Sequence, residues 1–277
     1  MAPTESQTGT IGKHLPLDLT SLMAMQVQRA TSQETIEALL DESDRPFLPL
    51  SYRFMQLRDD QDKGVPGPLA AFVTAHNNRG LHQYLLAHAA ASGGAFEVTR
   101  DSRVWARALG LAEDKESSRA AVSKGWRWLE RAKLIRRDRR GRLAQITLLS
   151  DDGSGRPYQH PSKQKPRQSF IRLPYAFWRQ RWHEKLDLPS LAVLLIGMSL
   201  DRNFILPQSH VQRWYGISAA TLSKGISGLR HHDLIAVTRT PEPAPLAPEG
   251  FRYVYRYTMR EPFHRRVLSK KKVEEGE

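Results

Sequence analysis

Residues 123–135 read SKGWRWLERAKLI, and 100 positions later residues 223–235 read SKGISGLRHHDLI. The two segments share Ser-Lys-Gly at their start, one internal Leu, and Leu-Ile at their end. A segment that recurs along a chain indicates two copies of one structural unit. We therefore expect the chain to contain an internal repeat.

The agreement continues upstream, where residues 105–111 read WARALGL and residues 211–217 read VQRWYGI. The offset here is 106 positions against 100 for the first pair, so the first copy carries six additional residues, which we place in a loop near 112–117. Each copy then predicts a short helix, a turn that opens at Gly110 or Gly216, and a second helix that ends at Leu-Ile. This order is the helix-turn-helix layout.

The segments that follow Leu-Ile predict β-hairpins. In the first copy, Gly141 separates two strand-like runs, which is typical of a hairpin. In the second copy, a Pro-rich loop at 240–250 precedes the aromatic run 251–257. A helix-turn-helix followed by a hairpin resembles the winged-helix family. The resemblance implies an α+β fold, mainly α with small β-hairpin wings, built from two tandem winged-helix domains that bind DNA.

The starts of the two copies also match. Residues 47–54 read FLPLSYRF and residues 170–177 read FIRLPYAF, and each predicts an edge strand that leads into a short helix. A capping box at Thr31 and Glu34 predicts a helix before the first copy. The expected organisation is an N-terminal extension at 1–45 that is disordered over its first 20 residues, a winged-helix domain at 46–149, a linker at 150–169, a second winged-helix domain at 170–260, and a basic tail at 261–277.

The charge of the chain favours a polyanionic partner. Its 277 residues include 42 Lys and Arg against 29 Asp and Glu, a formal net charge of +13. Residues 103–142 alone hold 13 basic against 5 acidic side chains, so the excess is concentrated in the first helix-turn-helix and its hairpin. Nucleic acid and an anionic membrane surface both fit this balance. The longest apolar run, at 191–200, is too short to span a bilayer and predicts a buried helix.

The second helix of each copy is the expected reading element. Val122, Trp126 and Leu129 share one face and are predicted to pack inward, which turns the polar face toward the groove of double-stranded DNA. Lys124 and Lys224 occupy the same place in both copies, and either phosphate anchoring or a shared folding role explains this. The residues expected to contact DNA are Arg119, Ser123, Lys124, Arg127, Arg137, Arg139, Arg140 and Arg142 in the first copy, and Ser218, Thr221, Ser223, Lys224 and Ser227 in the second.

The two hairpins differ in chemistry. Three arginines flank Gly141 at the tip of the first hairpin, where they suit the minor groove or the flanking phosphates. The second hairpin is long, rich in proline and nearly uncharged at its tip, so we expect it to read DNA weakly or to contact a partner.

Catalysis is not expected. The chain has no cysteine, which excludes disulfides and cysteine-ligated zinc, and it shows neither a Gly-rich phosphate loop nor a nucleophile elbow. The pair His231–His232 lacks further ligands at metal-binding spacing. We expect no catalytic residue, metal, cofactor, membrane contact or small-molecule effector. Cysteine usage fits a cytoplasmic, nucleoid-associated protein, and a homodimer is left open.

Three functions remain on the sequence alone. The leading hypothesis is a bacterial, sequence-specific transcriptional regulator. The alternative is a replication initiator of a plasmid or mobile element, because chains with two winged helices that each open with an aromatic-Leu-Pro-type strand are similar to plasmid initiators. A protein-interaction module is the third hypothesis, and the charge argues against it.

Overall fold

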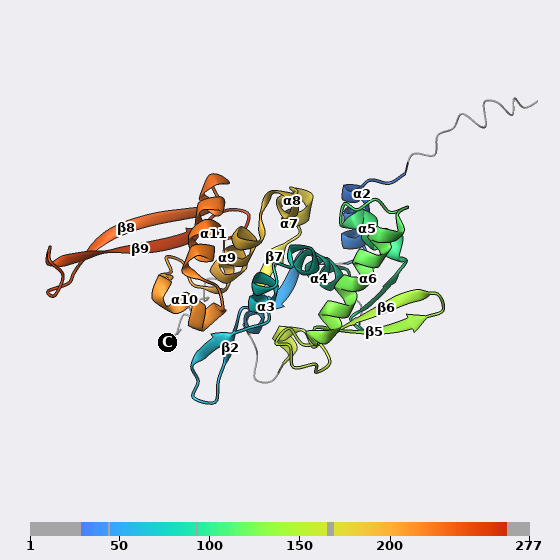
Figure 1. Ribbon diagram of the computed structural model, residues 1–277, viewed down its shortest axis with the longest axis horizontal. Coiled ribbons are helices and arrows are strands. Elements are labelled where there is room, and N and C mark those ends of the chain that lie inside the picture. Colours follow the sequence, from blue (N-terminus) through green and yellow to red (C-terminus); the bar gives the residue numbers. More distant parts are fainter. Residues whose placement is uncertain (1–28, 44, 92–93, 165–168, 265–277) are drawn as a thin grey trace, which may run out of the picture. The chain divides into compact units, whose positions relative to one another are not determined.

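The computed structural model describes residues 29–43, 45–91, 94–164 and 169–264 (Figure 1). The chain divides into two units, Met1–Ala30 and Thr31–Glu277, and the second contains every element described below. The predictions for the first 20 residues and for the basic side chains of the tail beyond 264 lie outside the described residues.

The fold is α+β, with 43% helix and 23% strand in small antiparallel sheets. Two sets of elements follow one another along the chain. The first comprises α2 (Ser32–Asp41), β1 (Phe47–Ser51), η1 (Tyr52–Phe54), β2 (Gln56–Arg58), β3 (Gly64–Pro66), α3 (Leu69–Thr74), α4 (Asn78–Ala90), β4 (Glu97–Arg100), α5 (Ser102–Ala108), α6 (Glu116–Arg131), β5 (Ile135–Arg140) and β6 (Leu143–Leu148). The second comprises η2 (Pro161–Lys163), β7 (Phe170–Pro174), α7 (Ala176–Arg179), α8 (Trp182–Lys185), α9 (Leu188–Ser199), α10 (Gln208–Tyr215), α11 (Ala219–His231), β8 (Ile235–Pro243) and β9 (Phe251–Met259).

Strands β1 and β7 join the two halves. Each is followed by a short helix as predicted, but the two strands pair with each other, with Phe47 opposite Pro174 and Ser51 opposite Phe170. The sequence match that aligns Phe47 with Phe170 also aligns Ser51 with Pro174. If each residue is replaced by its counterpart in the other copy, the same residue pairs result. Two subunits related by the two-fold axis of a symmetric dimer pair in the same way. This approximate axis passes beside Pro49, which lies opposite its own counterpart.

Each copy contains the short helix, the turn and the second helix that were predicted, namely α5 and α6 in the first copy and α10 and α11 in the second. Gly110 and Gly216 open the turns in the left-handed conformation, both with φ of +67°. Helix α6 begins at Glu116, within the segment placed in a loop, so the loop is shorter than predicted. A three-stranded sheet of order β4-β6-β5 completes the first copy. In the second copy a single bridge between Phe204 and Tyr257 replaces the pairing of β4 with β6.

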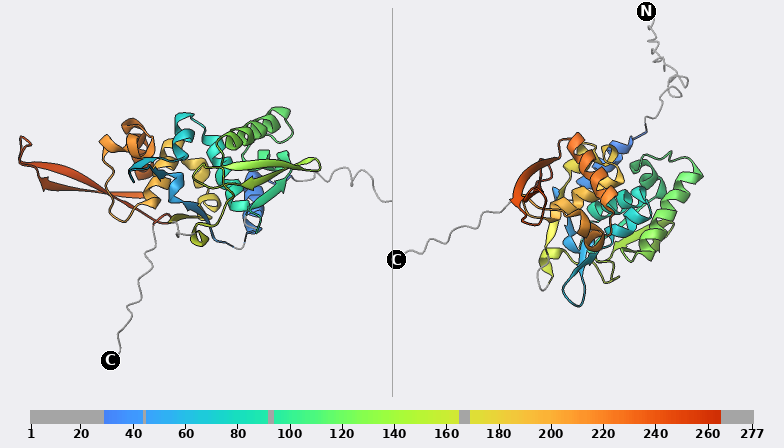
Figure 2. Two further views of the ribbon diagram at one scale, coloured as in Figure 1. Left: turned by 90° about the horizontal axis from the view of Figure 1, so that it is seen from below. Right: turned by 60° about the vertical axis from the view of Figure 1, so that its left-hand side comes forward.

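Both predicted hairpins form, and they differ in length. Gly141, with φ of +63°, begins the two-residue loop between β5 and β6, a place where hairpins favour glycine. The β8–β9 hairpin has nine residues in each strand, against six in β5 and six in β6. The two hairpins project in opposite directions from the helices (Figures 1 and 2).

The glycines shared by the two copies permit close helix crossings. A Cβ on Gly125 would lie 2.0 Å from Gln83 Oε1 of α4, and one on Gly225 would lie 2.5 Å from Pro189 O and from a methyl group of Val193 in α9. Cβ atoms do not approach other heavy atoms so closely. The shared glycine thus has a packing role, because it brings α6 against α4 in the first copy and α11 against α9 in the second.

Parts of the segment expected as a linker pack against the first half: Pro157 forms a β-bridge with Leu149, and Tyr158 Oη donates to Pro49 O at 3.4 Å. Asp151 is buried and accepts hydrogen bonds from Ser51 N (2.8 Å), Tyr84 Oη (3.0 Å) and the ring of His88 (3.1 Å). The Tyr158 side chain is also buried. Gly153 N donates to Ser150 O in a turn, and Pro161 begins the short helix η2.

Helix α9 is buried almost all round, as its apolar sequence predicted; Leu191, Leu194 and Leu195 have no exposed surface. Among the residues that the structure describes, no helix combines the length and apolar character needed to cross a membrane.

Candidate nucleic-acid interface

Helix α6 turns a polar face away from the core. Val122, Trp126 and Leu129 are buried as predicted, and the Trp126 ring packs edge-on against Trp105 with centroids 5.1 Å apart. On the other side Lys124 and Arg127 are exposed. Neither cation forms an ion pair within the described part of the chain. Ser123 is half-buried between the two faces.

The tip of the β5–β6 hairpin adds three more exposed cations. Arg139, Arg140 and Arg142 surround Gly141 and have no ion-pair partner among the described residues. An unpaired guanidinium gives up no protein contact when it meets a phosphate. Helix α6 leads into β5 within four residues, so its exposed face and this hairpin belong to one continuous piece of structure.

Two predicted contact residues have protein surroundings of their own. Arg137 is half-buried, and its Nη2 lies 3.5 Å from Glu130 Oε2 at the end of α6. Arg119 is also half-buried, and its Nε atom is covered without a hydrogen-bond partner. Because Arg137 already lies beside a carboxylate and both side chains are partly covered, they are weaker candidates than the cations of the tip.

Ser218 and Thr221 are engaged at the start of α11. Ser218 caps the helix by accepting a hydrogen bond from Thr221 N at 3.1 Å, and the two hydroxyl oxygens lie 2.9 Å apart. Further along, Ser223, Lys224 and Ser227 are exposed. Of the predicted contact residues, this face exposes one cation, Lys224, whereas α6 exposes Lys124 and Arg127. The exposed Arg230, near the end of the helix, was not predicted as a contact residue.

The lysine common to both copies has different surroundings in each. Lys224 Nζ lies 3.3 Å from Asp187 Oδ2, and Asp187 also caps α9 by accepting from Ser190 N. Burial raises the pKa of Asp187, but the hydrogen bonds from Ser190 and Lys224 outweigh it and leave the pKa below its usual value. In the first copy the capping residue of α4 is Asn77, which carries no charge. Lys124 therefore lacks the carboxylate that holds Lys224.

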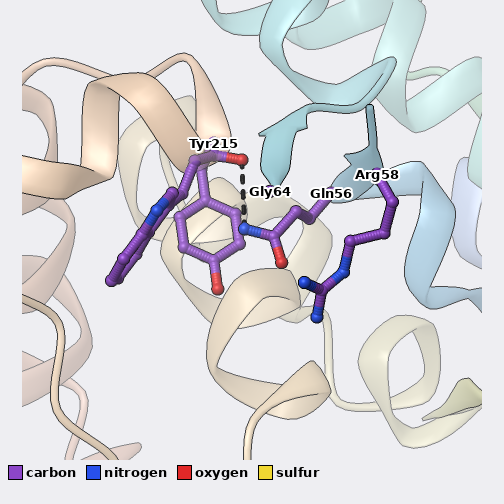
Figure 3. Close-up of a pocket in the computed structure, with 5 residues that line it drawn as sticks. Gln56, Arg58, Gly64 and Tyr215 are labelled. Carbon is purple, nitrogen blue, oxygen red and sulfur yellow. Dashed lines mark hydrogen bonds between the residues drawn. The ribbon is translucent and has the colours of Figure 1, made fainter. Parts of the chain in front are cut away.

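The described pocket lies between the two halves, and none of these cations lines it. Gln56, Arg58 and Gly64 of the β2–β3 hairpin and Trp214 and Tyr215 of α10 line a space of about 240 Å³ (Figure 3). Gln56 Nε2 donates to the Trp214 carbonyl at 3.4 Å, so the hairpin braces the first helix of the second copy. Neither this hairpin nor β4 was predicted from sequence.

The acidic cluster after β2 is engaged in local hydrogen bonds. In the turn after β2, Asp59 Oδ1 accepts hydrogen bonds from Gln61 N and Lys63 N, which is the structure of a solvated turn. Among the described residues no three His, Asp or Glu side chains are placed to hold a metal ion.

Comparison with known proteins found no match: no family model, curated protein or solved structure matches this chain. The site is therefore interpreted from its own geometry.

Proposed function

We propose that this chain is a sequence-specific double-stranded DNA-binding protein, without catalytic activity, that regulates transcription through two tandem winged-helix units. The observation that carries the proposal is the group of unpaired cations on α6 and the β5–β6 tip. Lys124 and Arg127 project from the face of a helix that fits the major groove, where Lys and Arg pair with guanine edges. Arg139, Arg140 and Arg142 then fall beside the backbone or the minor groove.

The approximate two-fold axis at β1–β7 supports a composite target. Symmetric dimers present their reading helices to half-sites of opposite orientation. In this chain the strands that open the two copies pair with this symmetry, but α6 is basic and α11 offers mainly serine hydroxyls. We infer a site of two unlike half-sites, of which the half bound by α6 contributes most of the dependence on salt.

A selection of bound fragments from the source genome, followed by footprinting at physiological salt, tests the proposal. We expect one protected region near a promoter. Protection of a direct-repeat array, with distortion of adjacent A·T-rich duplex, would instead favour a replication initiator. If no fragment is enriched, the proposal fails and a protein-interaction module becomes the better hypothesis.

The salt dependence of affinity identifies the surface. Each phosphate contact contributes about −0.9 to the slope of log affinity against log salt, so Arg139→Ala with Arg140→Ala should flatten the slope by up to about 1.8. The matched control is Lys63→Ala with Arg179→Ala, which removes the same charge from β2–β3 and α7. Equal slopes for the two double variants would assign binding to another surface.

A further inference from the structure

Exposed apolar side chains of the described chain are concentrated on one hairpin. Five large apolar residues are exposed, and four of them belong to β8–β9: Leu246 at the tip (101%), then Phe251 (38%), Tyr253 (47%) and Tyr255 (47%). Isolated exposed apolar residues are ordinary, but a cluster marks an interaction surface. The position of this cluster on a projecting hairpin means that no other part of the described chain covers it (Figure 2).

The three rings share one face of the hairpin. Successive residues of a strand alternate between faces, so Phe251, Tyr253 and Tyr255 lie on the same side. Residues directly opposite one another across an antiparallel pair also share a face. Tyr255 lies opposite Arg239, and the residues opposite Tyr253 and Phe251 are prolines.

The charges of the hairpin are divided unequally between its faces. Both strands carry their remaining charged residues on the other face, where Arg256 Nη2 lies 3.0 Å from Glu242 Oε1. On the aromatic face, Arg239 is the one charged side chain along the described strands, and its guanidinium lies 4.0 Å from the centre of the Tyr253 ring. The face thus combines rings with a cation and has no carboxylate to repel a phosphate.

These features fit one class of occupant. Bases in a duplex cover each other's faces, whereas unpaired bases stack on aromatic side chains while nearby cations hold the backbone. The β8–β9 hairpin follows α11 in the second copy, as the arginine-tipped β5–β6 hairpin follows α6 in the first. We propose that the aromatic face of β9 binds an unpaired DNA strand by base stacking on Phe251, Tyr253 and Tyr255, with Arg239 contacting phosphate. This proposal rests on the DNA-binding function inferred above and names a second form of DNA.

Binding of a labelled thymidine oligonucleotide of about 20 nucleotides to the full chain tests the proposal. Phe251→Ser combined with Tyr253→Ser should weaken single-strand binding by about 10-fold per ring, because each stacked base is lost separately. Affinity for the selected duplex should change by less than about twofold, since α6 and the β5–β6 tip are untouched. Tyr253→Phe preserves the ring and should retain binding.

Leu246→Ser is the matched control, because it removes an exposed apolar side chain outside the aromatic face and should leave single-strand affinity unchanged. Circular dichroism and the urea midpoint identify a variant that fails to fold, in which case the single variant Tyr255→Ser is used. Absence of single-strand binding in the parent chain overturns the proposal. So does unchanged binding in folded ring variants, including the case in which they alter self-association instead. Failure of the parent to bind duplex, with ring-dependent single-strand binding intact, would refute the proposed regulatory function alone.

Discussion

Replacing the shared glycines by alanine should have unequal effects, and the structure indicates their size. At Gly225 the new methyl group would lie 2.5 Å from Pro189 O and from a methyl of Val193, with Pro189 C at 3.0 Å. The backbone of Pro189 cannot move independently of its helix, so α9 and α11 must separate to make room for the methyl group. Overpacking of this kind costs about 3 kcal/mol, and the better helix propensity of alanine offsets about 1. We expect Gly225→Ala to lower the free energy of unfolding by about 2 kcal/mol.

At Gly125 the obstacle is the end of a side chain. Gln83 is fully buried, its Nε2 donates to Val122 O at 3.2 Å, and its Oε1 has no partner. Moving it loses that hydrogen bond, about 1 kcal/mol, and disturbs local packing by a similar amount. Gly125→Ala alone should therefore cost about 1 kcal/mol after the gain in propensity. In a Gln83→Ala background the same change should stabilise by up to about 1 kcal/mol.

Urea unfolding followed by tryptophan fluorescence measures these differences. The coupling between Gln83→Ala and Gly125→Ala should be about 2 kcal/mol, whereas Gln83→Ala and Gly225→Ala should be additive, because they lie in different helix pairs. The close-crossing explanation is refuted if Gly225→Ala unfolds at the parent midpoint or above. It is equally refuted if Gly125→Ala has the same effect in both backgrounds.

Three further predictions concern charge and burial. Asp187→Asn should release Lys224 and steepen the salt slope of duplex binding by up to about 0.9, and an unchanged slope would mean that this lysine does not contact phosphate. Burial lowers the pKa of His82 to about 4, so the folded state binds fewer protons than the unfolded state between about pH 6.5 and 4. The contribution of His82 to the free energy of unfolding should be fully present above that window and should fall by up to about 3 kcal/mol across it as the pH drops. His82→Phe should remove this part of the pH dependence of stability. An unchanged pH profile in that variant would contradict the assignment. Asp151→Ala should cost about 3 kcal/mol or more in urea unfolding, because it leaves Tyr84 Oη and a backbone N–H buried without their acceptor, and a loss below about 1 kcal/mol would show that water replaces the carboxylate.

Local patterns predicted the elements that carry the candidate interface. The 3.6-residue spacing of Val122, Trp126 and Leu129 identified the inward face of α6, and Gly141 between two strand-like runs identified the first hairpin. Both inferences need only neighbours in sequence, because helix periodicity and turn chemistry act over a few residues. The exposed Lys124 and Arg127 followed directly from the buried face.

Partners distant in sequence were not predictable in this way. The match between residues 47–54 and 170–177 indicated two similar strands, but nothing local states that one pairs with the other. For the same reason, the carboxylates beside Arg137 and Lys224 became visible only in three dimensions. Segment 150–169 was interpreted from composition, which indicates turns but says nothing about the buried hydrogen bonds of Asp151.

The β1–β7 pairing has a consequence for how occupancy responds to the amount of protein. Two separate subunits must first meet, so the concentration of a DNA-binding dimer falls with the square of monomer concentration when the protein is scarce. Here the two related units are parts of one polypeptide, and dilution does not separate them. Under the proposed function, occupancy of an isolated target would rise in simple proportion to copy number at low abundance, with a Hill coefficient of about 1.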